Sequence, residues 1–448
     1  MNVLLIYPEF PDTFWSFKHA LGFIRKKASS PPLGLLTVAA MLPREWPVRL
    51  VDANVRKPTG QDLAWADYAF ISAMTVQRES VSRIIKRCKE AGVRIVAGGP
   101  LFTMEHERFE DVDHFVLNEA ELTLPAFLAD LARGRARRVY TTSGFAEMRE
   151  SPVPRWELAP LGAYASMSVQ YSRGCPYNCD FCNVTTLLGH RPRVKDAAQI
   201  VAELDGLYEL GWRGNIFFVD DNLIGNKRSL MTELLPALIE WRKGKRGISF
   251  NTQVSIDFAD DERLMRMMVE AGFESVFIGI ETPDQDSLAE CSKKQNMRRD
   301  LVADVKRIQR AGLQVQGGFI LGFDHDSPGT VKRLLDLIQK SGIVTAMVGL
   351  LQAIPGTRLY ERLKRAGRLR EWASGDNVDG TTNIVPLIDI EELRRGYKEL
   401  MRNLYSPEEY YQRIKTFLRE YRLPKIQLRL NPGHLFQQTL AFLRSIYR

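Results

Sequence analysis

Cysteine is scarce in this chain, with five residues in 448. Five cysteines are too few for a disulfide framework in a protein of this length, and the amino-terminal residues begin in a strand pattern without the basic lead of a secretory signal. No run of about 18 apolar residues occurs, so we expect no transmembrane helix. These absences predict a protein of the reducing cytoplasm.

Three of the five cysteines nevertheless fall within eight residues, at Cys175, Cys179 and Cys182. A structural zinc site usually has Cys or His ligands in paired C-x2-C spacing, and no second pair follows here. A [4Fe–4S] cluster normally takes four cysteines, so three leave one iron open to a small molecule. The spacing predicts such a cluster, whereas Cys88 and Cys291 lie in helical patterns and are interpreted as ordinary reduced cysteines.

The first part of the chain alternates short apolar runs with helical patterns. The runs predict strands at residues 2–8, 47–54, 68–73, 94–99 and 114–118. Such alternation indicates a doubly wound parallel sheet, whose ligands bind beyond the carboxyl ends of the strands. Those ends carry residues 8–12, 72–77, 98–100 and 118–121.

A second α/β series begins at residue 166 and leads directly into the cysteine loop. Its predicted strands are residues 166–171, 215–219, 248–254, 275–280, 314–321 and 347–353. Six strand–helix units predict a partial (β/α)6 TIM-type barrel with its active site at the carboxyl ends of the strands. We expect a first domain at 1–141, a linker at 142–165, the barrel at 166–365 and a helical, basic domain at 366–448.

The positive charge of the chain is concentrated at its end. Segment 410–448 holds eight Lys or Arg and a single acid, Glu420, so seven of the eight net positive charges fall there. Aromatic residues recur at helical spacing among them, which is typical of a helix packed on the barrel or of an interfacial helix. A membrane surface is the favoured anionic partner, since no nucleic-acid recognition module is visible.

The cysteine loop, Arg-Gly-Cys-Pro-Tyr-Asn-Cys-Asp-Phe-Cys, resembles the signature of the radical S-adenosylmethionine (SAM) superfamily. An open α/β domain before such a barrel resembles the cobalamin-binding-domain radical SAM enzymes. Four further runs resemble the hopanoid C-methylase branch: residues 13–21, 219–222, 279–283 and 317–323. The resemblance implies an α/β protein with a Rossmann-like cobalamin-binding domain, a radical SAM barrel and a helical region, and it implies a [4Fe–4S] cluster, SAM and cobalamin as cofactors.

The function that this resemblance implies is cobalamin-dependent C-methylation of an unactivated carbon in an apolar, isoprenoid or lipid substrate. It also implies a reductant protein such as flavodoxin or ferredoxin. Two alternatives stay open. One is a cobalamin-independent radical SAM enzyme that forms carbon–carbon bonds, cyclises or rearranges its substrate; the other is a non-catalytic cobalamin or iron–sulfur sensor. We expect a cytoplasmic protein that contacts the inner membrane face through residues 410–448.

The resemblance also implies roles for residues around SAM, with the three cysteines as iron ligands. Phe181 is expected against the adenine, and Asp220, Asp221 and Glu281 end barrel strands where SAM groups bind. For these acids, helix capping is the alternative role. One basic residue after the loop is expected to pair with the SAM carboxylate, with Arg193 preferred and a solvated loop as the alternative: Arg191, Arg193 or Lys195.

The cobalamin contacts are expected at strand ends of the first domain. They are Ser72, Thr75, Gln77, Gly98, Gly99 and Glu119. A plain strand-to-loop turn is the alternative role for the two glycines. The best-known cobalamin loop has Asp-x-His-x-x-Gly, and here His19 and Gly22 are present but Phe17 replaces the aspartate. Because a ligating histidine needs an acceptor for its second nitrogen, we predict that His19 is not a cobalt ligand.

Overall fold

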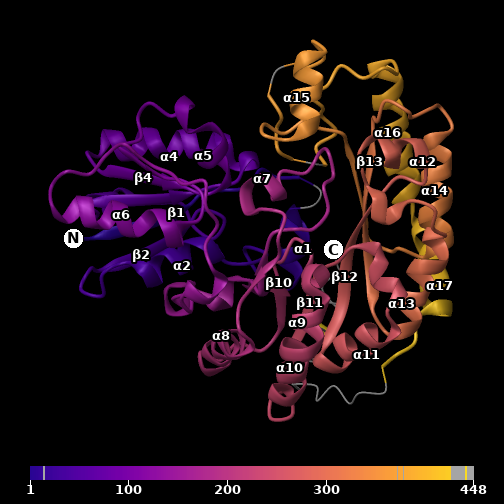
Figure 1. Ribbon diagram of the computed structural model, residues 1–448, viewed down its shortest axis with the longest axis horizontal. Helices are drawn as coiled ribbons and strands as arrows, with labels where there is room; N and C mark the ends of the chain where they lie inside the picture. The colour runs from indigo at the N-terminus through magenta and orange to yellow at the C-terminus, as the bar shows by residue number, and fades with distance from the viewer. Residues whose placement is uncertain (14–15, 371, 377, 425–438, 441–448) are drawn as a thin grey trace. The chain divides into compact units, whose positions relative to one another are not determined.

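The computed structural model describes residues 1–13, 16–370, 372–376, 378–424 and 439–440 (Figure 1). The chain forms two compact units that alternate along the sequence. The first contains Met1–Val169 and Arg193–Gly214, and the second contains Gln170–Pro192 and residues 215–424. The chain therefore enters the second unit at the start of the cysteine loop and leaves it again just after that loop.

The first unit is built on a parallel sheet with the strand order β2-β1-β3-β4-β5-β6. Its strands are β1 (Val3–Tyr7), β2 (Val48–Asp52), β3 (Tyr68–Ser72), β4 (Arg94–Gly98), β5 (His114–Val116) and β6 (Val139–Tyr140). The five predicted strands are confirmed. The sixth strand, β6, was not predicted because only two residues pair, too few to leave a pattern in the sequence.

Both faces of this sheet are buried, as the doubly wound pattern predicts. Along β1, Leu4 and Ile6 point into one apolar cluster, while Val3 and Leu5 point into another. The helices that precede or cover the strands are α1 (Lys18–Phe23), α2 (Leu33–Met41), α3 (Gly60–Trp65), α4 (Arg78–Glu90), α5 (Pro100–Glu105) and α6 (Ala120–Ala132).

The second sheet is parallel as well, in the order β14-β13-β12-β11-β10-β7. Its strands are β7 (Ser166–Val169), β10 (Asn215–Phe218), β11 (Ser249–Gln253), β12 (Phe273–Glu281), β13 (Gln314–Leu321) and β14 (Ala346–Leu350). The helices around the loop and between strands are α7 (Val184–Leu188), α8 (Ala197–Glu209), α9 (Lys227–Ser229), α10 (Leu235–Arg242), α11 (Glu262–Ala271), α12 (Gln285–Glu290), α13 (Leu301–Ala311) and α14 (Thr330–Ser341). Six parallel strands with intervening helices confirm the predicted partial barrel.

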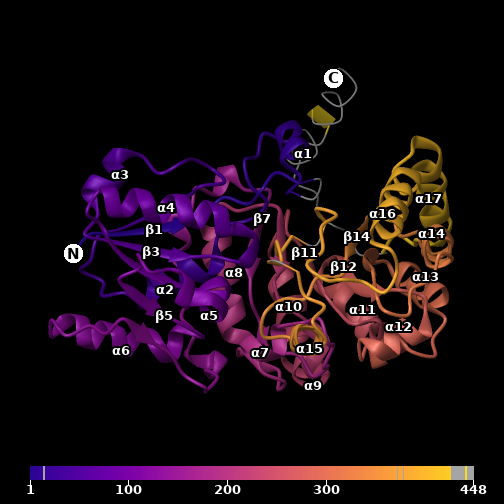
Figure 2. The same ribbon diagram turned by 90° about the horizontal axis from the view of Figure 1, so that it is seen from above.

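Three helices follow the barrel: α15 (Arg358–Arg365), α16 (Ile390–Leu404) and α17 (Pro407–Glu420). Seen from above, α16 and α17 lie beside α14 (Figure 2). Arg413 of α17 is fully buried and donates hydrogen bonds to the carbonyl oxygens of Leu404 (2.8 Å) and Val344 (3.2 Å). This part of the basic segment packs on the barrel, while its residues 425–438 and 441–448 lie outside the described residues. None of the described helices is long and apolar enough to cross a bilayer.

Candidate active site

The cysteine loop has a defined backbone fold of its own. The Cys175 amide donates to the carbonyl of Gly189 (3.2 Å), and the Cys182 amide donates to the carbonyl of Cys179 (3.2 Å). The Asp180 amide donates to the carbonyl of Cys291 (3.0 Å), which fixes the loop against the turn after α12. Protein hydrogen bonds therefore hold all three cysteines in place.

The three cysteines line a hollow of about 210 Å³ at the carboxyl ends of the barrel strands. Beside them it is lined by Tyr177, Phe181, Val184, Thr185, Asp221, Asn222, Gln253, Val254, Ser255, Phe277, Gly279, Glu281, Lys293 and Gln295. Within the described part of the chain, no three His, Cys, Asp or Glu side chains lie close enough to hold a single metal ion. Three thiols spread around one hollow suit a cluster, whose irons are bound one to each thiolate.

The chemistry of the lining also fits a bound cluster with a polar ligand. Burial raises the pKa of Cys175, and it raises the pKa of Cys182 to about 12. Binding of iron favours the thiolate form of such thiols, because the metal ligand is the deprotonated sulfur. The Gln295 side-chain nitrogen lies 3.8 Å from the Cys179 sulfur. The buried Gln295 carbonyl oxygen has no hydrogen-bond partner among the described residues, which leaves an acceptor for a ligand.

The two adjacent aspartates after β10 have different environments. Asp220 is fully buried and accepts hydrogen bonds from the amides of Tyr171 and Ser172 and from the Ser172 hydroxyl, so it holds the start of the loop. Asp221 lines the hollow. Burial, followed by the charge of Asp220, raises the pKa of Asp221 to about 6. Of the two predicted carboxylates, Asp221 is the one that faces the cysteines.

Glu281 ends β12 and lines the same hollow in an ion pair that the sequence did not predict. Its backbone is left-handed, with φ 67°, at a shift in the strand register. Its carboxylate lies 2.7 Å from the ammonium of Lys293, and both side chains are nearly buried. Lys293 lies 12 residues further on in an irregular turn, so no periodic pattern could have linked the two.

Phe181 lies in the wall of the cysteine hollow, and its contact with the adenine stays a prediction. Arg193 lies in the first unit, where its guanidinium forms a buried ion pair with Glu119 (2.5 Å). Two residues predicted to contact different cofactors thus bind each other, and their cofactor roles stay predictions. Of the other two basic candidates, Lys195 is buried against Glu203 and Arg191 is exposed.

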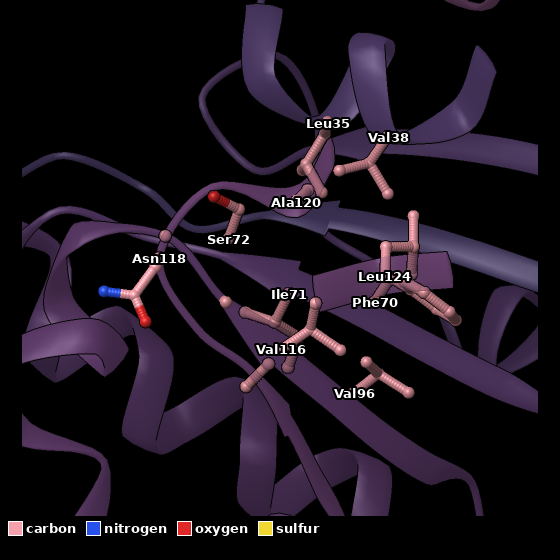
Figure 3. A pocket seen from close by; sticks show the side chains of 13 residues that line it. Leu35, Val38, Phe70, Ile71, Ser72, Val96, Val116, Asn118, Ala120 and Leu124 are labelled. Atoms are coloured by element: carbon pink, nitrogen blue, oxygen red, sulfur yellow. The ribbon is translucent and has the colours of Figure 1, made fainter. Parts of the chain in front are cut away.

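The first unit has a hollow of about 60 Å³ at the carboxyl ends of β3, β4 and β5. Figure 3 shows its lining: Leu35, Val38, Phe70, Ile71, Ser72, Val96, Ala97, Gly98, Gly99, Val116, Asn118, Ala120 and Leu124. Aliphatic side chains form most of the wall, and the polar groups of Ser72 and Asn118 lie together at one end (Figure 3). An uncharged ring system with hydrogen-bonding edges, such as part of a corrinoid, fits such a lining.

The predicted cobalamin residues are only partly brought together. Ser72, Gly98 and Gly99 line the hollow, whereas Thr75, Gln77 and Glu119 do not. Gln77 is buried and donates to the carbonyl of Pro8 (2.5 Å), so it braces its own loop. The remaining prediction, His19, lies exposed on α1 and does not line this hollow.

The two glycines have a packing reason of their own. A Cβ on Gly98 would lie 2.5 Å from the carbonyl oxygen of Val116, and one on Gly99 would lie 2.5 Å from the Ser72 hydroxyl. Gly99 also has φ 86°, which disfavours other residues. The strand-to-loop turn therefore requires both glycines, and the same turn forms the floor of the hollow.

Comparisons with known proteins agree with these two sites. Residues 25–128 match the B12-binding domain, and residues 169–338 match the radical SAM superfamily. Residues 357–448 match a domain of unknown function, DUF4070. The first match contains all residues that line the aliphatic hollow, and the second contains all that line the cysteine hollow.

Two relatives are similar over most of their length. An uncharacterised methyltransferase of Synechocystis sp. is 43% identical over 94% of this chain and 79% of its own. The hopanoid C-2 methylase of Rhodopseudomonas palustris is 36% identical over 91% of this chain and 77% of its own. Among solved structures, the radical SAM methyltransferase TsrM from Kitasatospora setae has a TM-score of 0.66 at 17% identity, covering 99% of this chain and 95% of TsrM.

The fold and the site together define a radical SAM enzyme with a B12-binding domain. Its cofactors are a [4Fe–4S] cluster, SAM and cobalamin. The chain belongs to the cobalamin-dependent radical SAM methyltransferases, in the branch of the hopanoid C-methylases. Its reaction is the C-methylation of a small molecule, so the cobalamin-free and sensor alternatives are set aside.

Proposed function

We propose that the substrate of this methyltransferase is an apolar, isoprenoid-type lipid with an unactivated carbon. The observation that carries the proposal is the 36% identity with the hopanoid C-2 methylase. A carbon without an acidic proton cannot be made nucleophilic by a side-chain base at neutral pH, so the cofactors must carry this chemistry. Apolar side chains in the wall of the cysteine hollow support it, namely Val184, Val254 and Phe277.

In this proposal the three cysteines hold the cluster and leave its fourth iron to SAM. When bound, the cluster supplies the electron that cleaves SAM, and cobalamin supplies the methyl group. Asp221 and Glu281 present carboxylates to the ammonium and ribose hydroxyls of SAM, and the Lys293 ammonium attracts its carboxylate. Phe181 offers a ring face to the adenine. These side chains bind and orient SAM and take no part in bond cleavage.

The aliphatic hollow is proposed to take an uncharged part of cobalamin, with hydrogen bonds from Ser72 and Asn118 at its polar end. Gln77 supports this site by bracing the loop after β3. Glu119 is proposed to act through its neighbour Asn118, because its own carboxylate is engaged by Arg193. We also propose that the domains of the chain meet near residues 141, 165 and 365, as the sequence predicts.

We also propose peripheral contact with the inner membrane face. On and just after α17, Tyr411, Leu418 and Leu423 are exposed by 60%, 63% and 83% of their surface, and the exposed Arg419 lies among them. Exposed aromatic and aliphatic side chains beside positive charges suit an anionic lipid surface. Arg413 is excluded from this surface because it is buried.

The test of the substrate is methyl transfer from isotopically labelled SAM to a hopanoid after anaerobic reconstitution with cluster and cobalamin. We expect a labelled methyl group on a ring carbon by mass spectrometry, and none with the Cys175→Ala variant. Formation of 5′-deoxyadenosine without label in the hopanoid would contradict the substrate class. Equal sedimentation of the full chain and a chain ending before Tyr410 with anionic vesicles would contradict the membrane contact.

A further inference from the structure

The helix α15 and the turn after it form a strongly basic segment. Residues 357–370 contain six Lys or Arg and one acid, Glu361. Its net charge of +5 in 14 residues is denser than that of segment 410–448, which has +7 in 39 residues. Helix α15 belongs to the same unit as the cysteine loop, so its place relative to the cluster site is defined.

Helix α15 packs directly on the cysteine loop. The Leu359 amide donates to the carbonyl of Asp180 (3.0 Å), and the Arg358 guanidinium pairs with the Asp180 carboxylate (2.7 Å). Leu359 and Leu363 on the inner face of the helix are buried in the apolar cluster that also packs against Phe181. Asp180 and Phe181 are the two residues between Cys179 and Cys182. The helix therefore packs on the part of the cluster loop between Cys179 and Cys182.

Half of the positive charges on this segment are neutralised by acids of the barrel. Arg358, Arg362 and Arg368 pair with Asp180, Glu290 and Asp324 at 2.7, 3.2 and 2.6 Å. The other three, Lys364, Arg365 and Arg370, are exposed and form no ion pair within the described residues. We call these three the α15 surface.

The composition of the α15 surface indicates the class of partner. A helix that binds a bilayer exposes apolar side chains among its charges. Here the apolar side chains Leu359 and Leu363 face inward, and the exposed residues of the helix are charged. A surface with uncompensated charge and without exposed apolar side chains attracts a partner protein of opposite charge. Such a surface has no apolar side chain to insert into lipid.

We propose that the α15 surface docks an acidic electron-transfer protein that carries a flavin or an iron–sulfur group. Docking there brings the donor to the helix that covers the cluster loop. One electron leaves the reduced donor, which is oxidised by one electron, and the cysteine-bound cluster is reduced by one electron without proton transfer. The inference rests on the proposed role of the three cysteines as cluster ligands.

The test compares two triple variants with the same change in charge. One is Lys364→Glu, Arg365→Glu and Arg370→Glu on the α15 surface. The control is Arg246→Glu, Arg263→Glu and Lys332→Glu, three exposed positions on other parts of the second unit. The reaction of each holoenzyme with a reduced, acidic flavodoxin is followed by stopped-flow bleaching of the cluster, and flavodoxin affinity is measured by calorimetry.

We expect the α15 variant to lose about tenfold or more in rate and affinity at low ionic strength, and the control to lose much less. The difference should shrink at high salt, where screening lengths fall below ~10 Å. Reduction by dithionite should be equal in all three proteins. Equal flavodoxin rates with normal dithionite reduction would overturn the docking inference alone. A cluster that dithionite cannot reduce would overturn the proposed function, and loss of vesicle binding in place of flavodoxin binding would assign the surface to lipid.

Discussion

The cysteine hollow and the aliphatic hollow both lie at the carboxyl ends of parallel strands, but different kinds of side chain line them. The first is lined by thiols, carboxylates and an ammonium, and the second by aliphatic side chains with two polar groups at one end. The strand ends determine where a ligand binds. The side chains that follow them determine whether the ligand is charged and reactive or large and uncharged.

The two hollows also differ in how their walls are stabilised. The wall of the cysteine hollow depends on paired charges such as Glu281 and Lys293, each of which is buried at a cost that only its partner offsets. The wall of the aliphatic hollow depends on packing between helix and sheet, which tolerates changes of similar volume. Single substitutions should therefore do more harm in the first hollow than in the second.

The largest effect is expected from the three cysteines that we propose as iron ligands. Cys175→Ala, Cys179→Ala and Cys182→Ala should each abolish SAM cleavage, because each removes one of only three protein ligands. The assay is the formation of 5′-deoxyadenosine under reducing conditions. The buried Cys88→Ala and Cys291→Ala variants are the controls and should keep the activity. An inactive Cys291→Ala with an intact fold would show that the ligand set is different.

Breaking the buried ion pair should have the next largest effect. Lys293→Met leaves the Glu281 carboxylate buried without its partner, so we expect the free energy of unfolding to fall by about 3–5 kcal/mol. The exposed neighbour Lys294→Met is the control and should change it by less than about 0.5 kcal/mol. Denaturant unfolding of the cofactor-free proteins measures both. Equal stability of the two variants would mean that the ion pair does not hold this wall.

The acidity of Asp221 provides a pH test of the same hollow. Its folded-state pKa of about 6 lies above the ordinary value of 3.8, so the folded protein retains a proton that the unfolded chain releases. The retained proton stabilises the folded protein, and this stabilisation is fully present below about pH 4. It is lost as the pH rises through 6, which lowers the free energy of unfolding by roughly 3 kcal/mol. Asp221→Asn should flatten this part of the profile. If Asp221→Asn left the pH dependence of the free energy of unfolding unchanged, the Asp221 carboxylate would be solvated and not buried.

Filling the aliphatic hollow should weaken corrinoid binding without touching the other hollow. Val38→Trp adds a ring to the lining, and we expect at least a tenfold loss of cobalamin affinity, about 1.4 kcal/mol, with SAM cleavage retained. Val153→Trp, at a position exposed by 43% outside the hollow, is the matched control. Equilibrium dialysis gives the affinity. Wild-type affinity in Val38→Trp would place the cobalamin elsewhere.

The smallest effect is expected at His19. Because its side chain is exposed on α1 and lies outside the aliphatic hollow, His19→Ala should leave the spectrum of bound cobalt unchanged. The measurement is electron paramagnetic resonance of the reduced cobalamin, in which an imidazole ligand splits the signal. Loss of a nitrogen splitting on substitution would identify His19 as the ligand and contradict the prediction.

The sequence by itself determined the features that depend on neighbouring residues. The spacing of Cys175, Cys179 and Cys182 predicted the cluster loop, since ligands close in the chain must lie close in space. Five strands of the first sheet and the barrel strands were predictable because buried parallel strands form continuous apolar runs. The turn at Gly98 and Gly99 was predictable because glycine follows strand ends where other side chains do not fit.

Only the tertiary structure decided which distant side chains meet. It separated Asp220, which holds the loop, from Asp221, which faces the cysteines, because adjacent residues at a strand end point in different directions. It paired Glu281 with Lys293 and Glu119 with Arg193, and it buried Arg413 while leaving Lys364, Arg365 and Arg370 in solvent. The sequence alone does not show whether a charged residue is paired, buried or exposed to solvent. Its surroundings are set by chain segments far away along the polypeptide, which is why the fold was needed to tell these charges apart.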